Sequence, residues 1–161
     1  MIGKTNKQKG FTLLFASLVG SLLLALGIAT FNIVLRELDL SSAARESRKA
    51  FYAADSGWEC AFYHDRKRPE VFATSTHSSP AASIQCANQT ISIISSTFPF
   101  SSISTFRVQL DGDACSDITI TKDDNDNKDK ISKTLIESRG KNDCSTNPNP
   151  NRVERAIRVK Y

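Results

Sequence analysis

The chain has 161 residues, 24% of them charged and 40% hydrophobic, which allows one modest domain and an appendage. Its formal net charge is +4, but three lysines lie in the first ten residues, and without them 18 basic residues face 17 acidic ones. A nearly neutral remainder gives no electrostatic case for dedicated nucleic-acid binding.

An uncharged, mostly apolar run extends from Phe11 to Leu35. As a helix it would be about 37 Å long at about 1.5 Å per residue, enough to span a bilayer. A secretory signal has a shorter apolar core and a small-residue cleavage site, whereas Arg36-Glu37-Leu38-Asp39 follows here. A buried helix of a soluble core would need an unusually large globule. We therefore expect a retained transmembrane helix over 11–35, with its N-terminal end in the cytoplasm and the rest outside.

The helical pattern continues past residue 40. Apolar and small residues recur there at steps of three and four, opposite a charged face: Ala43, Ala44, Ser47, Ala50, Phe51, Ala54, Trp58 and Ala61. The spacing predicts one helix over about 11–64, apolar all round at first and amphipathic over 36–64, and ended by Arg66-Lys67-Arg68-Pro69. Gly57 marks either a bend or a close packing contact.

The remaining sequence predicts a loop over 65–82 and an antiparallel sheet of four to six strands over 83–161. Residues of alternating polarity indicate half-buried strands; they are Ile84 and Cys86, Phe106 and Val108, Ile118 and Ile120, and Val153, Ile157, Val159 and Tyr161. Turns are expected at Asn88, at 111–113 and at 147–150. The predicted fold class is α+β, with a long N-terminal helix packed on a small antiparallel sheet.

All four cysteines, Cys60, Cys86, Cys115 and Cys144, lie in the part expected outside the membrane. An even number in an exported domain favours two disulfides, and the absence of a CxxC pair argues against zinc. Four cysteines permit three connectivities. We favour Cys60–Cys86, which would tie the helix end to the first strand, and Cys115–Cys144, which would close the hairpin.

Candidate chemistry is sparse, and we expect neither an enzyme nor a cofactor. The sequence has no GxSxG, HExxH or phosphate-loop motif. Cys60 and His64 are four residues apart on the helix, but a disulfide is favoured over a nucleophile or metal pair. Alternating oxygen donors make a weak calcium candidate of Asp123, Asn125, Asn127 and Asp129. Lys128 and Thr134 replace the glycine and glutamate of an EF-hand, so a polar hairpin turn is favoured.

The stretch Lys9-Gly10-Phe11-Thr12-Leu13, before a long helix that turns amphipathic, resembles the type IV pilin family. The resemblance implies a pilin-like fold and a basic leader, 1–10, that a prepilin peptidase removes between Gly10 and Phe11. Phe11 would then be N-methylated. The stretch from Ala50 to Gly57, Ala-Phe-Tyr-Ala-Ala-Asp-Ser-Gly, is similar to the helix of PilX-like minor pilins. The two stretches together cover the helix, about a third of the chain.

Two positions depart from the common pilin pattern. Pilins commonly carry a glutamate at the fifth mature position, where this chain has Phe15. A carboxylate in hydrocarbon is costly unless it is paired, so its absence favours a minor or tip subunit over drift in a lineage that uses other contacts. Gly20 and Gly27 stand in a segment where major pilins often have a kinking proline. They are expected to act as softer points.

A stripe of small residues spaced by four, Ser17, Ser21, Ala25 and Ala29, is a candidate packing face between membrane helices, although small residues are common in any such helix. The expected partners are other pilin subunits, the prepilin peptidase, the inner-membrane assembly machinery and lipid. The expected location is the inner membrane and then a cell-surface pilus.

Two alternatives stay open. The first is a membrane-anchored adhesin or ligand-binding module without a filament role, with Arg152, Arg158 and Lys160 as candidate contacts for anionic partners. The second is an ordinary single-pass membrane protein.

Overall fold

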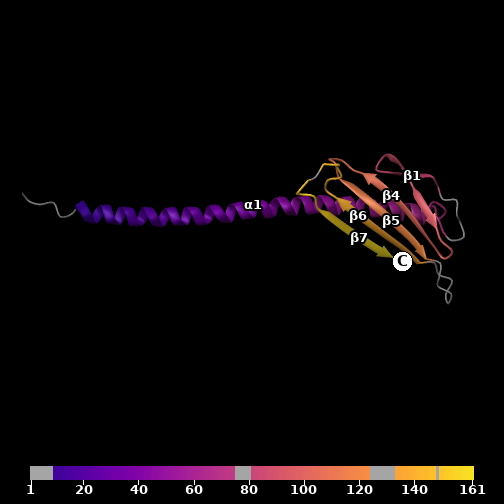
Figure 1. The fold of residues 1–161 in the computed structure, drawn as a ribbon, viewed down its shortest axis with the longest axis horizontal. Coiled ribbons are helices and arrows are strands. Elements are labelled where there is room, and N and C mark those ends of the chain that lie inside the picture. The colour runs from indigo at the N-terminus through magenta and orange to yellow at the C-terminus, as the bar shows by residue number, and fades with distance from the viewer. Residues whose placement is uncertain (1–8, 75–80, 124–132, 148) are drawn as a thin grey trace, which may run out of the picture. The chain divides into compact units, whose positions relative to one another are not determined.

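The computed structural model describes residues 9–74, 81–123, 133–147 and 149–161 (Figure 1). The chain divides between Ser42 and Ala43 into two compact units, each described by itself. The elements in order are α1 (Lys9–Lys67), β1 (Ser83–Cys86), β2 (Gln89–Ser92), β3 (Ile94–Thr97), β4 (Ser101–Gln109), β5 (Cys115–Asp123), β6 (Lys133–Lys141) and β7 (Glu154–Lys160). The class is α+β, as predicted.

The helix α1 extends beyond the predicted range of 11–64 at both ends. At its C-terminal end the Arg68 amide still donates a hydrogen bond to the His64 carbonyl oxygen at 2.9 Å, and Pro69 follows directly. His64, Arg66 and Lys67 lie in the last turn, where positive charge interacts favourably with the helix dipole. The basic residues expected to end the helix therefore partly belong to it.

The strands form two antiparallel sheets. A five-stranded sheet has the order β3-β4-β5-β6-β7, so that strands adjacent in sequence are adjacent in space, and β1 and β2 form a separate hairpin. Ala87 and Asn88, both with positive φ, make the tight turn of this hairpin, which confirms the turn expected at Asn88. The turn expected at 111–113 is also present, with Gly112 and Asp113 at φ 66° and 65°.

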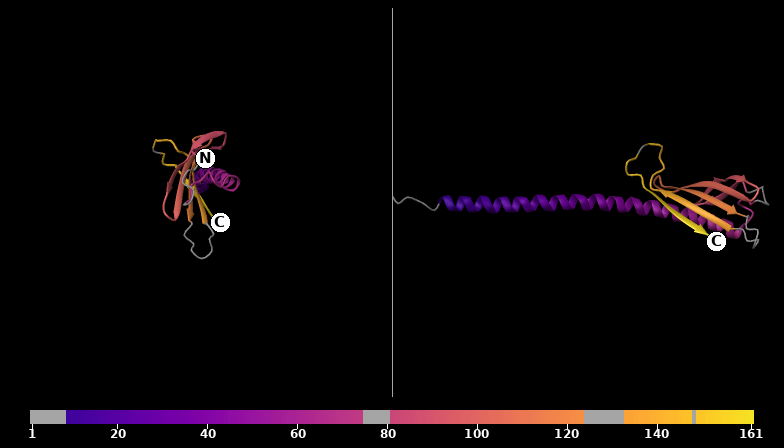
Figure 2. Two further views of the ribbon diagram at one scale, coloured as in Figure 1. Left: turned by 90° about the vertical axis from the view of Figure 1, so that its right-hand side faces the viewer. Right: turned by 60° about the horizontal axis from the view of Figure 1, so that its bottom comes forward.

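Within the second unit, the C-terminal part of α1 covers one face of the five-stranded sheet (Figure 2). The predicted alternation is confirmed on β4 and β5, where Phe106, Val108, Ile118 and Ile120 are buried beneath the helix, together with Ile136 of β6. On β7, Ile157 and Val159 are only half-buried, because this strand lies at the edge of the sheet.

The predicted loop over 65–82 needs two corrections. Residues 65–67 belong to α1, and Val71, Phe72 and Ala73 are buried in the core although they form no strand. The Phe72 ring stacks on Phe106 with 6.1 Å between ring centres. The segment is held by a hydrogen bond from the buried Ser102 hydroxyl to the Ala73 carbonyl oxygen. The Ser- and Pro-rich composition around this short apolar run concealed its role in the core.

Candidate functional site

The first unit, Met1–Ser42, contains the apolar part of α1. Its large exposed side chains over residues 11–35 have 44–74% of their surface accessible, and they lie on every side of the helix. By length and composition this helix is able to cross a membrane. In water, so much apolar surface would cost free energy at about 25 cal/mol per Å². Lipid or other apolar helices are the surroundings that suit it.

The polar and small residues of this segment are compatible with such surroundings. The hydroxyls of Ser17 and Ser21 donate to the carbonyl oxygens of Leu14 and Leu18, each at 2.9 Å. Each of these two serine hydroxyls therefore has an acceptor within its own helix, so neither is an unpaired donor in lipid. Gly20 and Gly27 have open space around them, where an added Cβ would meet no atom within 4 Å.

The other residues predicted to take part in processing or helix packing lie on the same helix. Phe15 is exposed, as are Ala25 and Ala29 of the small stripe. Gly10 lies in the first turn of α1, and the exposed Phe11 follows it. Cleavage between Gly10 and Phe11 stays a prediction.

In the second unit, α1 contacts the sheet through small residues. Ala50, Ala53, Ala54, Gly57 and Ala61 are buried beneath it. The sequence pattern places Ala43, Ala44 and Phe51 on the same face, but the sheet leaves these three exposed. The pattern also missed Ala53. The fully buried row begins at Ala50; just before it, Glu46 accepts a hydrogen bond from the Asn142 amide at 2.8 Å, and Ser47 Oγ accepts one from Arg155 Nε of β7 at 2.9 Å.

Two glycines set how closely helix and sheet approach. A Cβ at Gly57 would overlap the Oγ atoms of Ser116 and Ser138, and one at Gly140 of β6 would overlap the backbone of Ala50 and Ala54. Gly57 is therefore a close packing contact, one of its two predicted roles. Ser138 Oγ lies 2.7 Å from the Ala54 carbonyl oxygen and donates to it across the contact.

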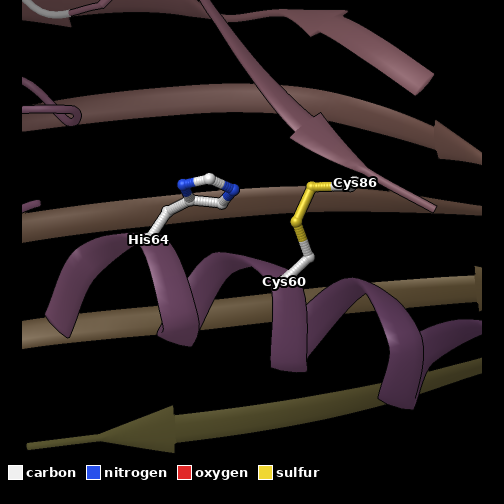
Figure 3. A group of neighbouring side chains, drawn as sticks. All are labelled: Cys60, His64 and Cys86. Atoms are coloured by element: carbon white, nitrogen blue, oxygen red, sulfur yellow. A yellow bond between two sulfur atoms is a disulfide. The ribbon is translucent and has the colours of Figure 1, made fainter. Parts of the chain in front are cut away.

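Both disulfides join the pairs favoured from the sequence, Cys60–Cys86 and Cys115–Cys144. Figure 3 shows His64 beside the first one. One ligand atom from each of Cys60, His64 and Cys86 lies within 4.8 Å of the others. The two sulfur atoms are bonded to each other and are not thiolates, the form that binds metals, so this group is a cross-link. His64 Nε2 donates to the Gln85 carbonyl oxygen at 3.0 Å.

The calcium candidate lies largely outside the described residues. Asn125, Asn127 and Asp129 are not described, and only Asp123 is, at the end of β5. Its register partners are Ser101 of β4 and Lys133 of β6. The hairpin formed by β5 and β6 agrees with the expected connection between these strands. The calcium hypothesis itself stays a prediction.

The solvent-facing side of the sheet carries paired charges. Asp117 contacts Arg107 Nε at 2.5 Å and Lys141 Nζ at 2.9 Å. Burial raises the pKa of the Asp117 carboxyl, but the hydrogen bonds from Arg107 and Lys141 together outweigh it and the pKa falls. Hydrogen bonds from Arg158 and Arg139 lower the pKa of Glu137 in the same way. These ion pairs fix side chains across neighbouring strands.

The basic residues proposed as contacts for anions are partly engaged. Arg158 donates to Glu137 at 2.5 Å. Arg152 precedes β7 instead of lying on its outer face, and it donates to the Ser145 carbonyl oxygen at 2.5 Å and to that of Asn147 at 3.2 Å. Lys160 is exposed. Two of the three side chains thus have internal partners.

Sequence reasoning missed a buried ionic group at the end of α1. The Asp65 carboxylate lies 2.6 Å from Lys122 Nζ of β5, and both side chains are buried. The Tyr161 hydroxyl donates to the same carboxylate at 2.7 Å. Burial, and secondly this hydrogen bond, raise the pKa of Tyr161 well above its usual value. The one signal in the sequence is Lys122, which continues the inward alternation of Ile118 and Ile120.

Comparisons with models of protein families, with curated proteins and with solved structures found no match to this chain.

Proposed function

We propose that the chain is a subunit, minor or located at the tip, of a type IV pilus or a related secretion filament. One observation carries the proposal. A single helix is apolar and exposed all round over 11–35 and, from Ala50 onward, buries a narrow row of small residues beneath an antiparallel sheet. The first part suits lipid and neighbouring helices in turn, while the second part holds a domain at the surface.

The proposed action is assembly, without chemical turnover. The leader ends at Gly10, and the helix from Phe11 onward stays in the membrane until the assembly machinery extracts it. Once out of lipid, its apolar surface must be covered by other helices, because exposure to water is unfavourable. The stripe that begins at Ser17 and Ser21 allows close approach, since small side chains let backbones come near one another.

Phe15 supports the minor or tip location. A subunit with an unpaired carboxylate in an apolar bundle would be destabilised, whereas a phenylalanine needs no neighbouring amine. The exposed Phe15 side chain suits contact with lipid or with an apolar neighbour.

The mature N-terminus tests the proposal. The chain is expressed with and without a prepilin peptidase, and intact mass and N-terminal sequencing are measured. We expect a chain that starts at N-methylated Phe11 only with the peptidase, and Gly10→Val blocks the cut. A chain that still starts at Met1, or one cut after Leu35, contradicts the proposal. The first result favours a membrane-anchored adhesin and the second a secreted domain.

A second experiment addresses location. Filaments sheared from cells that carry Phe15→Glu are compared with wild-type filaments for the number of copies of this chain. We expect more copies per filament, because the carboxylate meets the terminal amine of a neighbour. An unchanged low copy number would show that Phe15 does not determine where the subunit lies.

A further inference from the structure

The surface of α1 that faces away from the sheet carries a second pattern. Its members, which we call the outward stripe, are spaced by four and then three residues, twice over: Arg48, Tyr52, Asp55, Glu59, Tyr63 and Arg66. At about 100° per residue they lie within about 80° of one another around the helix. Tyr52 is 64% exposed and Tyr63 60% exposed. The buried row of small residues lies on the other side.

The charges of the outward stripe differ from those of the sheet in having few partners. On the sheet surface, Asp117 and Glu137 each contact two cations. Among the described residues, no ion pair involves Arg48, Asp55 or Glu59. Asp55 and Glu59 even lie one turn apart, where like charges repel. Asp55 is half-buried and the other members of the stripe are exposed. A largely exposed surface with unpaired, segregated charges and two tyrosines is suited to a partner with the complementary order of charges.

The outward stripe itself contains two segments with complementary orders of charge. Its first triplet, Arg48-Tyr52-Asp55, reads cation, aromatic, anion, and its second, Glu59-Tyr63-Arg66, reads anion, aromatic, cation with the same spacing. The two triplets are 11 residues apart, which is three helical turns or about 16 Å. Arg66 is also held over the Tyr161 ring, 4.7 Å from its centre, so its position is fixed.

We propose that the outward stripe binds a second copy of this chain, parallel to the first and displaced by 11 residues along the helix. Arg48 of one copy then meets Glu59 of the other, Tyr52 meets Tyr63, and Asp55 meets Arg66. Without the displacement, each charged side chain faces a side chain of the same charge, and the two copies repel each other. A contact of this kind uses different residues on the two copies, so it is heterologous.

The inference rests on the proposed function for the parallel orientation, because chains inserted the same way into one membrane point the same way. Copies anchored at the same depth carry Arg48 at the same height, and their stripes repel. The paired register becomes available when one copy moves relative to the other, as it does on extraction into a filament. The stripe therefore disfavours association before extraction and favours it afterwards, and it places copies of this minor subunit side by side.

Zero-length cross-linking of the full chain in detergent micelles tests the register. Arg48→Lys supplies an amine, and a carbodiimide joins it only to a carboxylate in direct contact. Equal amounts of ¹⁴N- and ¹⁵N-labelled chains are mixed, so mixed-isotope peptides report links between copies. We expect a mixed-isotope link from residue 48 to Glu59. A link to Asp55 of the other copy would mean an antiparallel pair or a displacement of seven residues, and no mixed-isotope link would mean that the stripe does not join copies. Either result overturns the proposal.

Matched variants separate charge pairing from contact through the apolar segment. Glu59→Gln in the Arg48→Lys background should abolish the link. Arg48→Glu should weaken self-association, measured by sedimentation, by about fivefold to tenfold, and Arg48→Glu with Glu59→Arg should restore it. A double reversal as weak as the single one overturns the proposed register. The mature N-terminus of each sample is sequenced too, so a failure of leader processing is recognised separately from a failure of the stripe.

Discussion

Gly140→Ala tests the close contact between helix and sheet. A Cβ at this position would overlap the backbone of Ala50 and Ala54, and backbone atoms are unable to swing aside as a side chain does. Either β6 or α1 must shift, which would disturb the row from Ala50 to Gly57. Overpacking of this kind typically costs about 1–3 kcal/mol, and we expect the upper end, about 3 kcal/mol. For a domain of this size that lowers the melting temperature by about 10 °C.

Thermal unfolding of the full chain in detergent, followed by fluorescence, measures the effect. The chain has a single tryptophan, Trp58, which stacks on Phe62 beneath the sheet and reports on this contact. Gly20→Ala is the matched control, because an added Cβ there has nothing within 4 Å. Gly20→Ala should leave unchanged the unfolding temperature that is measured by Trp58 fluorescence. If Gly140→Ala unfolds at the wild-type temperature, the helix does not lie against β6 as closely as described, and the reasoning is refuted.

Four further changes have expected outcomes. Asp65→Asn leaves Lys122 charged and buried, so denaturant unfolding should show a loss of about 3–5 kcal/mol; adding Lys122→Met should recover part of it, and no recovery would contradict this reason. Replacing Cys115 and Cys144 by alanine should cost about 3.5 kcal/mol from loop entropy, and a loss below about 1 kcal/mol would count against that account. Because the folded pKa of Glu137 is lowered, its stabilisation is complete only above the unfolded pKa, at about pH 5 and higher, and is lost as pH falls through the lowered value; the stability of Glu137→Gln should depend less on pH there. The raised pKa of Tyr161 makes stability fall as pH rises above about 10, and Tyr161→Phe should remove that decline.

Much of the fold could be predicted because its signals are local. The change from a helical period to strict alternation located α1 and the inward residues of β4 and β5. The turn predicted at Asn88, from a residue type common in turns, is present with a positive φ. Val71 to Ala73 escaped notice because three apolar residues in a polar loop have no period. Ala43 lies within about 20° of Ala50 around the helix and is still exposed, because periodicity gives the angle of a residue and does not say where the covering sheet begins.

The candidate site also has features that the sequence predicts and features that it does not. Phe11 to Leu35 required no tertiary information, because an uncharged run of this length is suited to a membrane whatever the domain beside it does. The favoured disulfide pairs also followed from order along the chain. The engagement of Arg158 depended on the distance between β6 and β7, and that of Arg152 on the course of the segment between them; no pattern within a strand contains that information.

Local sequence patterns were enough to predict the long helix, its apolar and amphipathic halves, and the alternation of the strands, because each depends on neighbours within a few residues. Which residues of the amphipathic half are covered depended on how the sheet packs against it. Gly140 allows the sheet to approach Ala50 and Ala54, and Asp65 finds Lys122 and Tyr161 far along the chain. Covering one side of α1 leaves Arg48 to Arg66 on the other. That exposed side is a consequence of packing, since the same residues on an isolated helix would be no more exposed than any others.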